Sequence, residues 1–150
     1  MNADVSSADP GYEFLDAVTS DLAFVARGAT LGAVFAAAGR ALLSATLDNP
    51  QDVGERVERS IALEEPDLEL LLLRFLNELV YLRDAEELLL CPQHVIVNRD
   101  GVARLEADLR GERIQPGRHS LASEVKAATA HGLKVTHTPD GWEATVTLDV

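Results

Sequence analysis

The chain has 150 residues, of which 47% are hydrophobic and only 5% aromatic, so we expect one compact domain with an aliphatic core. Acidic residues outnumber basic ones by 25 to 13, and the net charge of −12 repels polyphosphate, which argues against autonomous nucleic-acid binding. The run of four leucines, Leu70–Leu73, is too short to span a membrane, and no targeting signal precedes it. We therefore expect a cytoplasmic protein with no membrane partner, a disordered tail over residues 1–10 and a domain over residues 11–150.

The first half of the chain predicts two short strands, a helix and a third strand. Tyr12–Leu15 and Leu22–Arg27 are the two strands, and a polar segment with an aspartate at each end lies between them. Thr30 is placed to cap a helix whose apolar residues recur every three or four positions and which ends at Asn49-Pro50. Val53–Leu63 is predicted as an edge-like charged strand, with Val57, Ile61 and Leu63 on one face and Arg56, Glu58 and Ser60 on the other.

A second helix begins after the acidic residues around Pro66, where negative charge meets the positive end of the helix dipole. Its apolar residues form one broad face, and further leucines extend that face around the helix, so it is expected to pack on a sheet. Asn77 and Glu78 interrupt the apolar pattern. We interpret them as a solvated strip, with a partner-facing role as the alternative.

The second half is rich in strands. Val95–Val97 and Val102–Leu109 flank a turn that ends in Gly101, which predicts a hairpin. Glu124–Thr129 and Leu133–Thr138 are two further predicted strands. The last strand alternates without error from Trp142 to Val150. Together these patterns predict an α+β fold, a two-layer domain with a largely antiparallel sheet and two helices packed on it.

Familiar catalytic motifs are absent from the sequence. There is no Gly-x-Ser-x-Gly elbow, glycine-rich phosphate loop or His-Glu-x-x-His helix, and the four histidines are not spaced as a metal cluster. The single cysteine, Cys91, can close no internal disulfide and has no second thiol for a zinc site, so we interpret it as a small hydrophobic residue. The sequence therefore favours a protein that is not an enzyme.

Carboxylates form the one candidate site. Because the last strand is predicted to run to the final residue, the side chain of Asp149 and the main-chain carboxylate of Val150 lie close together. Asp16 and Asp21 are the aspartates at the two ends of the early polar segment. These groups offer only oxygen atoms, which suit a hard divalent cation such as Ca²⁺, with Mg²⁺ or Mn²⁺ as alternatives.

Six ordered segments resemble the archease family of small accessory proteins. The similarity runs from Gly11 to Val150, and the matching segments are Tyr12–Asp16, Gly28–Leu31, Leu76–Leu82, Arg110–Glu112, Glu124–Leu133 and the terminal Trp142–Ala144 with Leu148–Val150. The family's early element reads Asp-His-Thr-Ala-Asp, whereas this chain is one residue longer there and has Ala17 and no histidine. The two aspartates at its ends, Asp16 and Asp21, are retained.

This resemblance implies a function without catalysis by the chain itself. Archeases promote guanylylation of the RNA ligase that joins tRNA halves after intron removal, and support its multiple turnover. The resemblance implies that Asp21 binds metal beside Asp149 and the carboxylate of Val150, with Asp16 as the matching first aspartate. Lys126 and His131 lie in a family segment and are candidate contacts to the ligase, the alternative being that they are merely solvated.

Two other functions remain open. The altered early element leaves room for a metal-binding, chaperone-like interaction module that serves another nucleic-acid-processing enzyme. A small hydrolase with paired carboxylates ranks last, because such an enzyme needs two carboxyl groups with separated pKa values in one pocket.

Overall fold

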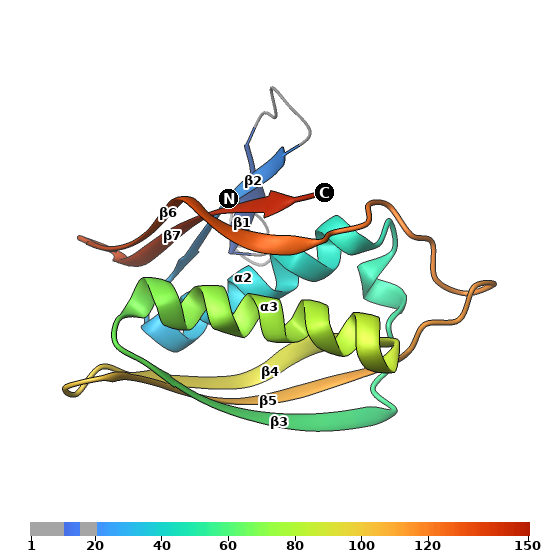
Figure 1. Cartoon of the computed structure of the whole chain (residues 1–150), viewed down its shortest axis with the longest axis horizontal. Coiled ribbons are helices and arrows are strands. Elements are labelled where there is room, and N and C mark those ends of the chain that lie inside the picture. Colours follow the sequence, from blue (N-terminus) through green and yellow to red (C-terminus); the bar gives the residue numbers. More distant parts are fainter. Residues whose placement is uncertain (1–10, 16–20) are drawn as a thin grey trace, which may run out of the picture.

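Two antiparallel sheets with two α-helices between them make up the fold of the computed structural model, which describes residues 11–15 and 21–150 (Figure 1). In chain order the elements are β1 (Tyr12–Phe14), β2 (Asp21–Gly28), α2 (Leu31–Thr46), the 3-10 helix η1 (Pro50–Asp52), β3 (Val57–Glu65), α3 (Leu68–Glu86), β4 (Leu88–Asn98), β5 (Ala103–Arg113), β6 (Ala127–Thr138) and β7 (Gly141–Asp149). The α+β class with antiparallel strands and two helices, as predicted, is confirmed for these residues.

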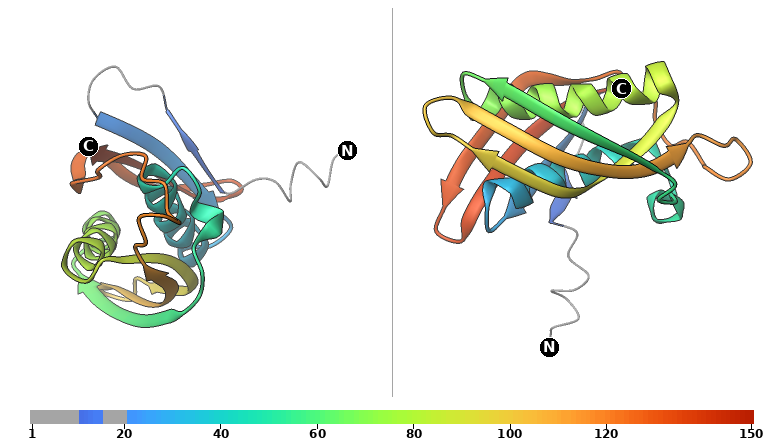
Figure 2. Two further views of the ribbon diagram at one scale, coloured as in Figure 1. Left: turned by 90° about the vertical axis from the view of Figure 1, so that its right-hand side faces the viewer. Right: turned by 90° about the horizontal axis from the view of Figure 1, so that it is seen from below.

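The strands divide into two sheets. One has the order β1-β2-β7-β6 and the other the order β3-β5-β4. Helix α2 contacts β2 of the first sheet and β4 of the second, and α3 likewise contacts β6 on one side and β3, β4 and β5 on the other. Figure 2 shows the helices end-on between the sheets. The sequence suggested a single sheet with both helices on it, and the apolar residues that extend around α3 are explained by its contact with two sheets.

Helix α2 begins after its predicted cap, Thr30, and α3 begins after the acidic residues around Pro66, with Asp67 as its cap. The Oγ1 atom of Thr30 accepts a hydrogen bond from the amide of Ala33 at 3.1 Å, and Oδ1 of Asp67 accepts one from the amide of Leu70 at 2.8 Å. These bonds satisfy amides that a helix start otherwise leaves without partners. Helix α2 ends at Thr46, earlier than the Asn49-Pro50 boundary predicted, because Leu47 is extended and forms a β-bridge with Leu121, and Pro50 begins η1.

Strand predictions were right for position and wrong for several boundaries. β3 lies at the edge of its sheet as predicted. β4 begins at Leu88, well before the predicted Val95, and its pairing with β5 is irregular around Pro92. The two strands predicted between Glu124 and Thr138 are the single strand β6, whose pairing shifts between Thr129 and Lys134.

The core lies between the sheets and around the helices. Its largest fully buried side chains include Phe24 of β2, Phe35 of α2 and Phe75 of α3, and most of the rest is Leu, Val and Ala. Cys91 is half-buried beside a smaller cluster of Leu43, Leu47 and Leu89. Burial raises the pKa of its thiol, so it behaves as the small hydrophobic residue predicted.

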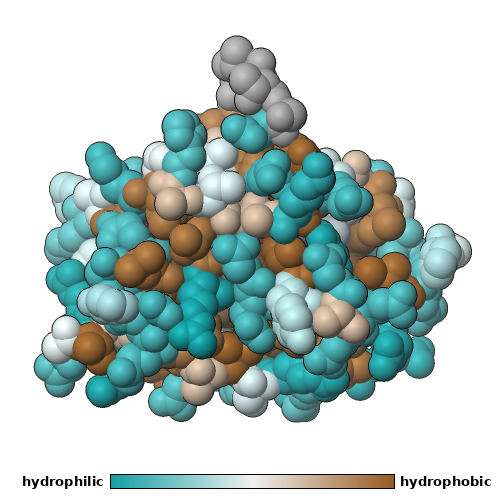
Figure 3. All heavy atoms as spheres, viewed as in Figure 1, coloured by the Kyte–Doolittle hydropathy of each residue, from teal (hydrophilic) through white to brown (hydrophobic). Residues whose placement is uncertain are grey.

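Hydrophilic residues cover most of the face shown in Figure 3, and the hydrophobic residues between them form small separate groups. This surface is consistent with the strongly acidic composition. Among the described residues, no helix has the length and apolar character that crossing a membrane requires.

Candidate functional site

Two aspartates meet at one end of the four-stranded sheet. Asp21 begins β2, Asp149 ends β7, and the register places them directly opposite each other. The next pair, Leu22 and Leu148, points to the core, so the aspartate side chains point to the outer face of the sheet. Directly opposed residues have Cβ atoms about 4.5–5.5 Å apart. The fold therefore brings together two of the predicted metal ligands.

This is the one place in the described strand pairings where an acidic residue faces another acidic residue. Elsewhere on the same sheet Arg27 faces Glu143, and on the other sheet Arg104 faces Glu64. Like charges directly opposite each other destabilise a sheet, and a bound cation removes that cost. We name Asp21, Asp149 and Val150 the acidic edge.

The donor set of the acidic edge fits a hard cation. Val150 directly follows Asp149 and packs against the core, so its main chain lies beside the aspartate pair. Asp16 lies outside the described residues. No group of three or more His, Cys, Asp or Glu side chains within residues 11–15 and 21–150 is arranged to hold a metal ion. A complete site therefore needs oxygen atoms besides the side chains of Asp21 and Asp149, such as a main-chain carboxylate, Asp16 or water.

Lys126 lies next to the acidic edge. Its main-chain amide donates a hydrogen bond to the carbonyl oxygen of Asp149 at 2.7 Å, and the following residue, Ala127, pairs directly with Asp149. The residue is exposed and immediately precedes β6, whereas the sequence placed it within a strand. The structure thus brings this candidate partner contact to the predicted metal ligands.

His131 lies farther along β6, away from the acidic edge. It falls in the stretch between Thr129 and Lys134 where the pairing with β7 is irregular, and it is exposed. The neighbouring Gly132 has a φ of +67°, a conformation that favours glycine. His131 and Lys126 are therefore separate features of β6.

Asn77 of α3 has a role that the sequence interpretation missed. It is not part of a solvated strip: its Oδ1 accepts a hydrogen bond from the amide of Ala128 at 2.8 Å, and its Nδ2 donates one to the carbonyl of Ala128 at 3.1 Å. Nearby, Arg83 donates to the carbonyl of Val125 at 2.6 Å. An Asn in the middle of an apolar helix, where it is a poor helix former, was the available signal.

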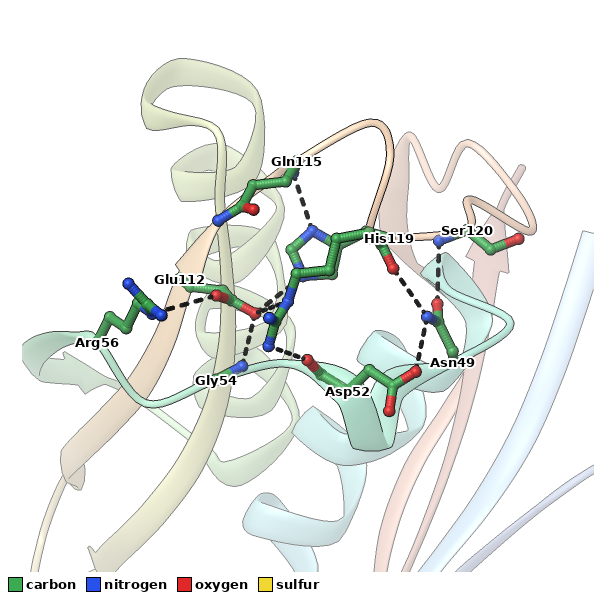
Figure 4. A network of polar contacts seen from close by, with 9 residues as sticks. Asn49, Asp52, Gly54, Arg56, Glu112, Gln115, His119 and Ser120 are labelled. Carbon is green, nitrogen blue, oxygen red and sulfur yellow. Dashed lines mark hydrogen bonds and ion pairs between the residues drawn. The ribbon is translucent and has the colours of Figure 1, made fainter.

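A second polar cluster surrounds the buried Glu112 at the end of β5 (Figure 4). One oxygen, Oε2, accepts hydrogen bonds from the amide of Gly54 at 2.6 Å, Nε2 of His119 at 2.9 Å and Nε of Arg118 at 3.1 Å. Nε of Arg56 lies 4.0 Å from the other oxygen, Oε1, which has no hydrogen-bond partner among the described residues. The cluster joins the loops that precede β3 and follow β5.

The protonation states of this cluster follow from its geometry. Nδ1 of His119 accepts a hydrogen bond from the amide of Gln115 at 2.9 Å, so the neutral ring carries its proton on Nε2 and donates it to Glu112. The amide of Gly54, opposed by burial and helped by His119 and Arg118, holds the pKa of Glu112 below its usual value. The carboxylate therefore stays charged inside the protein. No pattern in the sequence indicates that these separate residues form a cluster.

The fold and the acidic edge together define a class of small α+β protein in which two sheets enclose two helices and a carboxylate pair closes the end of one sheet. Comparison with known sequences identifies the family within this class. The sequence model of the Archease protein family (MTH1598/TM1083) matches residues 12–150. The chain belongs to the archease family.

Individual relatives agree with this assignment. Proteins named "Protein archease" from Methanosarcina acetivorans and Pyrococcus furiosus are 36% and 37% identical to this chain, covering 93% and 88% of it and 95% and 94% of their own lengths. The solution structure of protein 1598 of Methanobacterium thermoautotrophicum superposes with a TM-score of 0.82 at 32% identity, covering 95% of this chain and all of that one. These names state no enzymatic activity.

Proposed function

We propose that this protein activates the RNA ligase that joins tRNA halves, by promoting guanylylation of the ligase's active-site histidine and supporting multiple turnover. The protein acts in trans, in the cytoplasm, and does not itself join RNA. Membership of the archease family supports the proposal. The structural observation that carries it is the direct opposition of Asp21 and Asp149 at the end of a sheet.

The acidic edge is the proposed working part of the molecule. Asp21, Asp149 and the carboxylate of Val150, together with Asp16, would hold a divalent cation, Ca²⁺ first and Mg²⁺ or Mn²⁺ as alternatives. Such an ion, when bound, supplies positive charge that binds the phosphate oxygens of a nucleotide. The surrounding acidic surface is attracted to the basic RNA channel of a ligase, which favours the approach of this edge to the ligase active site.

The rate of ligase guanylylation tests the proposal. We expect Asp149→Ala to lower that rate strongly in the presence of Ca²⁺. Asp140→Ala is the matched control, because Asp140 lies in the turn at the opposite end of β7 and should leave the rate near that of the unmodified protein. Equal rates for Asp149→Ala and the unmodified protein would remove the acidic edge from the mechanism.

A pull-down from the source cells tests the identity of the partner. Recovery of a tRNA ligase with the tagged protein supports the proposed function. Reproducible absence of that ligase, with another nucleic-acid-processing enzyme recovered instead, would favour the general metal-binding interaction module over a ligase activator.

A further inference from the structure

The free edge of β6 is held by side chains of α3. β6 is the last strand of its sheet, and an edge strand leaves a row of main-chain amides and carbonyls without strand partners. Asn77 bonds both groups of Ala128, and Oε2 of Glu69 accepts a hydrogen bond from the amide of Val135 at 3.0 Å. Asn77 and Glu69 are eight residues apart, about 12 Å along the helix axis. α3 therefore fastens the strand at two separate points.

The contact of Asn77 is the more complete of the two. Its carboxamide has both a donor and an acceptor, and it pairs with Ala128 as the peptide group of a neighbouring strand would. Ala128 is only 4% exposed, so water cannot readily replace these bonds. A buried main-chain group that loses its hydrogen-bond partner destabilises the structure around it. The start of β6 depends on this side chain.

The start of β6 in turn holds the acidic edge. Ala127, adjacent to Ala128, pairs directly with Asp149, and the amide of Lys126 donates to the carbonyl of Asp149. Strand ends fray unless such contacts tie them down. Metal-binding residues also need neighbouring hydrogen-bond partners that fix their orientation.

We propose that Asn77 is a positioning residue for the acidic edge: by pairing with Ala128 it fixes residues 126–128 and, through them, the position of Asp149 opposite Asp21. Arg83, which holds the carbonyl of Val125, supports the same segment. The inference rests on the proposed function, because it assigns a supporting residue to the cation site proposed there.

The experiment compares Asn77→Ala with Glu69→Ala, which removes the contact at the other end of the same strand. Calcium affinity is measured by isothermal titration calorimetry, and opening of the strand end by hydrogen exchange of the Lys126 amide. We expect Asn77→Ala to weaken calcium binding by about tenfold, the lower end of the usual effect of losing such a supporting contact. It should also speed exchange at Lys126. Glu69→Ala should speed exchange at Val135 and leave calcium affinity within about twofold.

A second variant keeps the test decisive if Asn77→Ala folds poorly. Asn77→Gln retains the donor and the acceptor of the carboxamide on a longer side chain. This variant should recover part of the lost calcium affinity. Equal calcium affinity for the unmodified protein and both Asn77 variants would overturn the positioning role alone. If the unmodified protein binds no Ca²⁺, the proposed cation site fails and the positioning role fails with it.

Discussion

Replacing Glu112 should separate the energetic effect of its hydrogen bonds from that of its charge. In Glu112→Ala, the fully buried Nε2–H of His119 and the half-buried amide of Gly54 lose their acceptor, whereas Arg118 is exposed enough to reach water. A buried donor without a partner costs about 1–3 kcal/mol. Counting both donors, we expect Glu112→Ala to lower the free energy of unfolding by about 3 kcal/mol, near the low end for a broken buried ion pair.

Glu112→Gln should cost less, because it keeps the hydrogen bonds of the cluster. All three hydrogen bonds reach Oε2, while Oε1 has no hydrogen-bond partner among the described residues. A glutamine can place its carbonyl oxygen at the position of Oε2 and its amide nitrogen at the position of Oε1. The three hydrogen bonds are then kept, but the charge is lost and the amide N–H groups at the position of Oε1 have no acceptor among the described residues. We expect the free energy of unfolding to fall by about 2 kcal/mol, less than for Glu112→Ala.

Urea unfolding followed by circular dichroism between pH 7 and pH 3 measures both effects. Because the folded state holds the pKa of Glu112 below its usual value of 4.5, the stability that this carboxylate contributes is complete above that pH. It is lost as the pH falls through the folded-state pKa. The stability difference between the unmodified protein and Glu112→Gln should therefore shrink in acid. A difference that stays constant, or that grows as the pH falls, would refute this account of the cluster.

Three further outcomes follow from the structure. Asp149→Asn removes the repulsion from Asp21, so its melting temperature should exceed that of the unmodified protein in chelator, while added Ca²⁺ should raise it less. Thr30→Ala removes the cap of α2 and should lower the free energy of unfolding by about 1 kcal/mol in urea titrations. Cys91, whose thiol pKa is raised by burial, should react with a thiol reagent at pH 7 more slowly than free cysteine does, and urea should abolish the difference.

Periodic elements could be predicted from the sequence, and irregular ones could not. β7 has strict alternation because only one of its faces is buried, so its position was predicted within a residue. The start of β4 was missed because Leu88, Leu89 and Leu90 are all buried, which removes the alternation. Pro92, which is unusual within a sheet, also argued against a strand there.

Alternation also could not show which strands belong to which sheet. Alternation reveals which face of a strand is apolar, but it does not show which strands are its neighbours in a sheet. In this fold the apolar faces of both sheets pack on helices. The single sheet suggested by the sequence was therefore a reasonable but incomplete description.

The residues of the acidic edge could be predicted from the sequence, whereas the contacts that hold them in place could not. The alternation of the last strand predicted that Asp149 lies in an ordered strand, and the family resemblance placed Asp21 beside it. Asn77 depends on the register between a helix and an edge strand, which no local pattern encodes. Glu112 follows the buried Gly111 and is itself buried, because the loops carrying Gly54 and His119 cover the outer face of β5 there.

The strand pairing at the acidic edge differs from that of other acidic residues on the two sheets. Elsewhere on the two sheets several acidic residues are compensated across strands, as Arg27 pairs with Glu13 and Glu143 and Arg104 pairs with Glu64. A chain with a net charge of −12 gains from such pairing, since excess charge repels itself in the compact state. Asp21 and Asp149 are instead two carboxylates in register with each other, at a strand end that α3 holds in place. Sequences break such local rules mainly where function requires it, and the cation that we propose the two carboxylates share fits their chemistry.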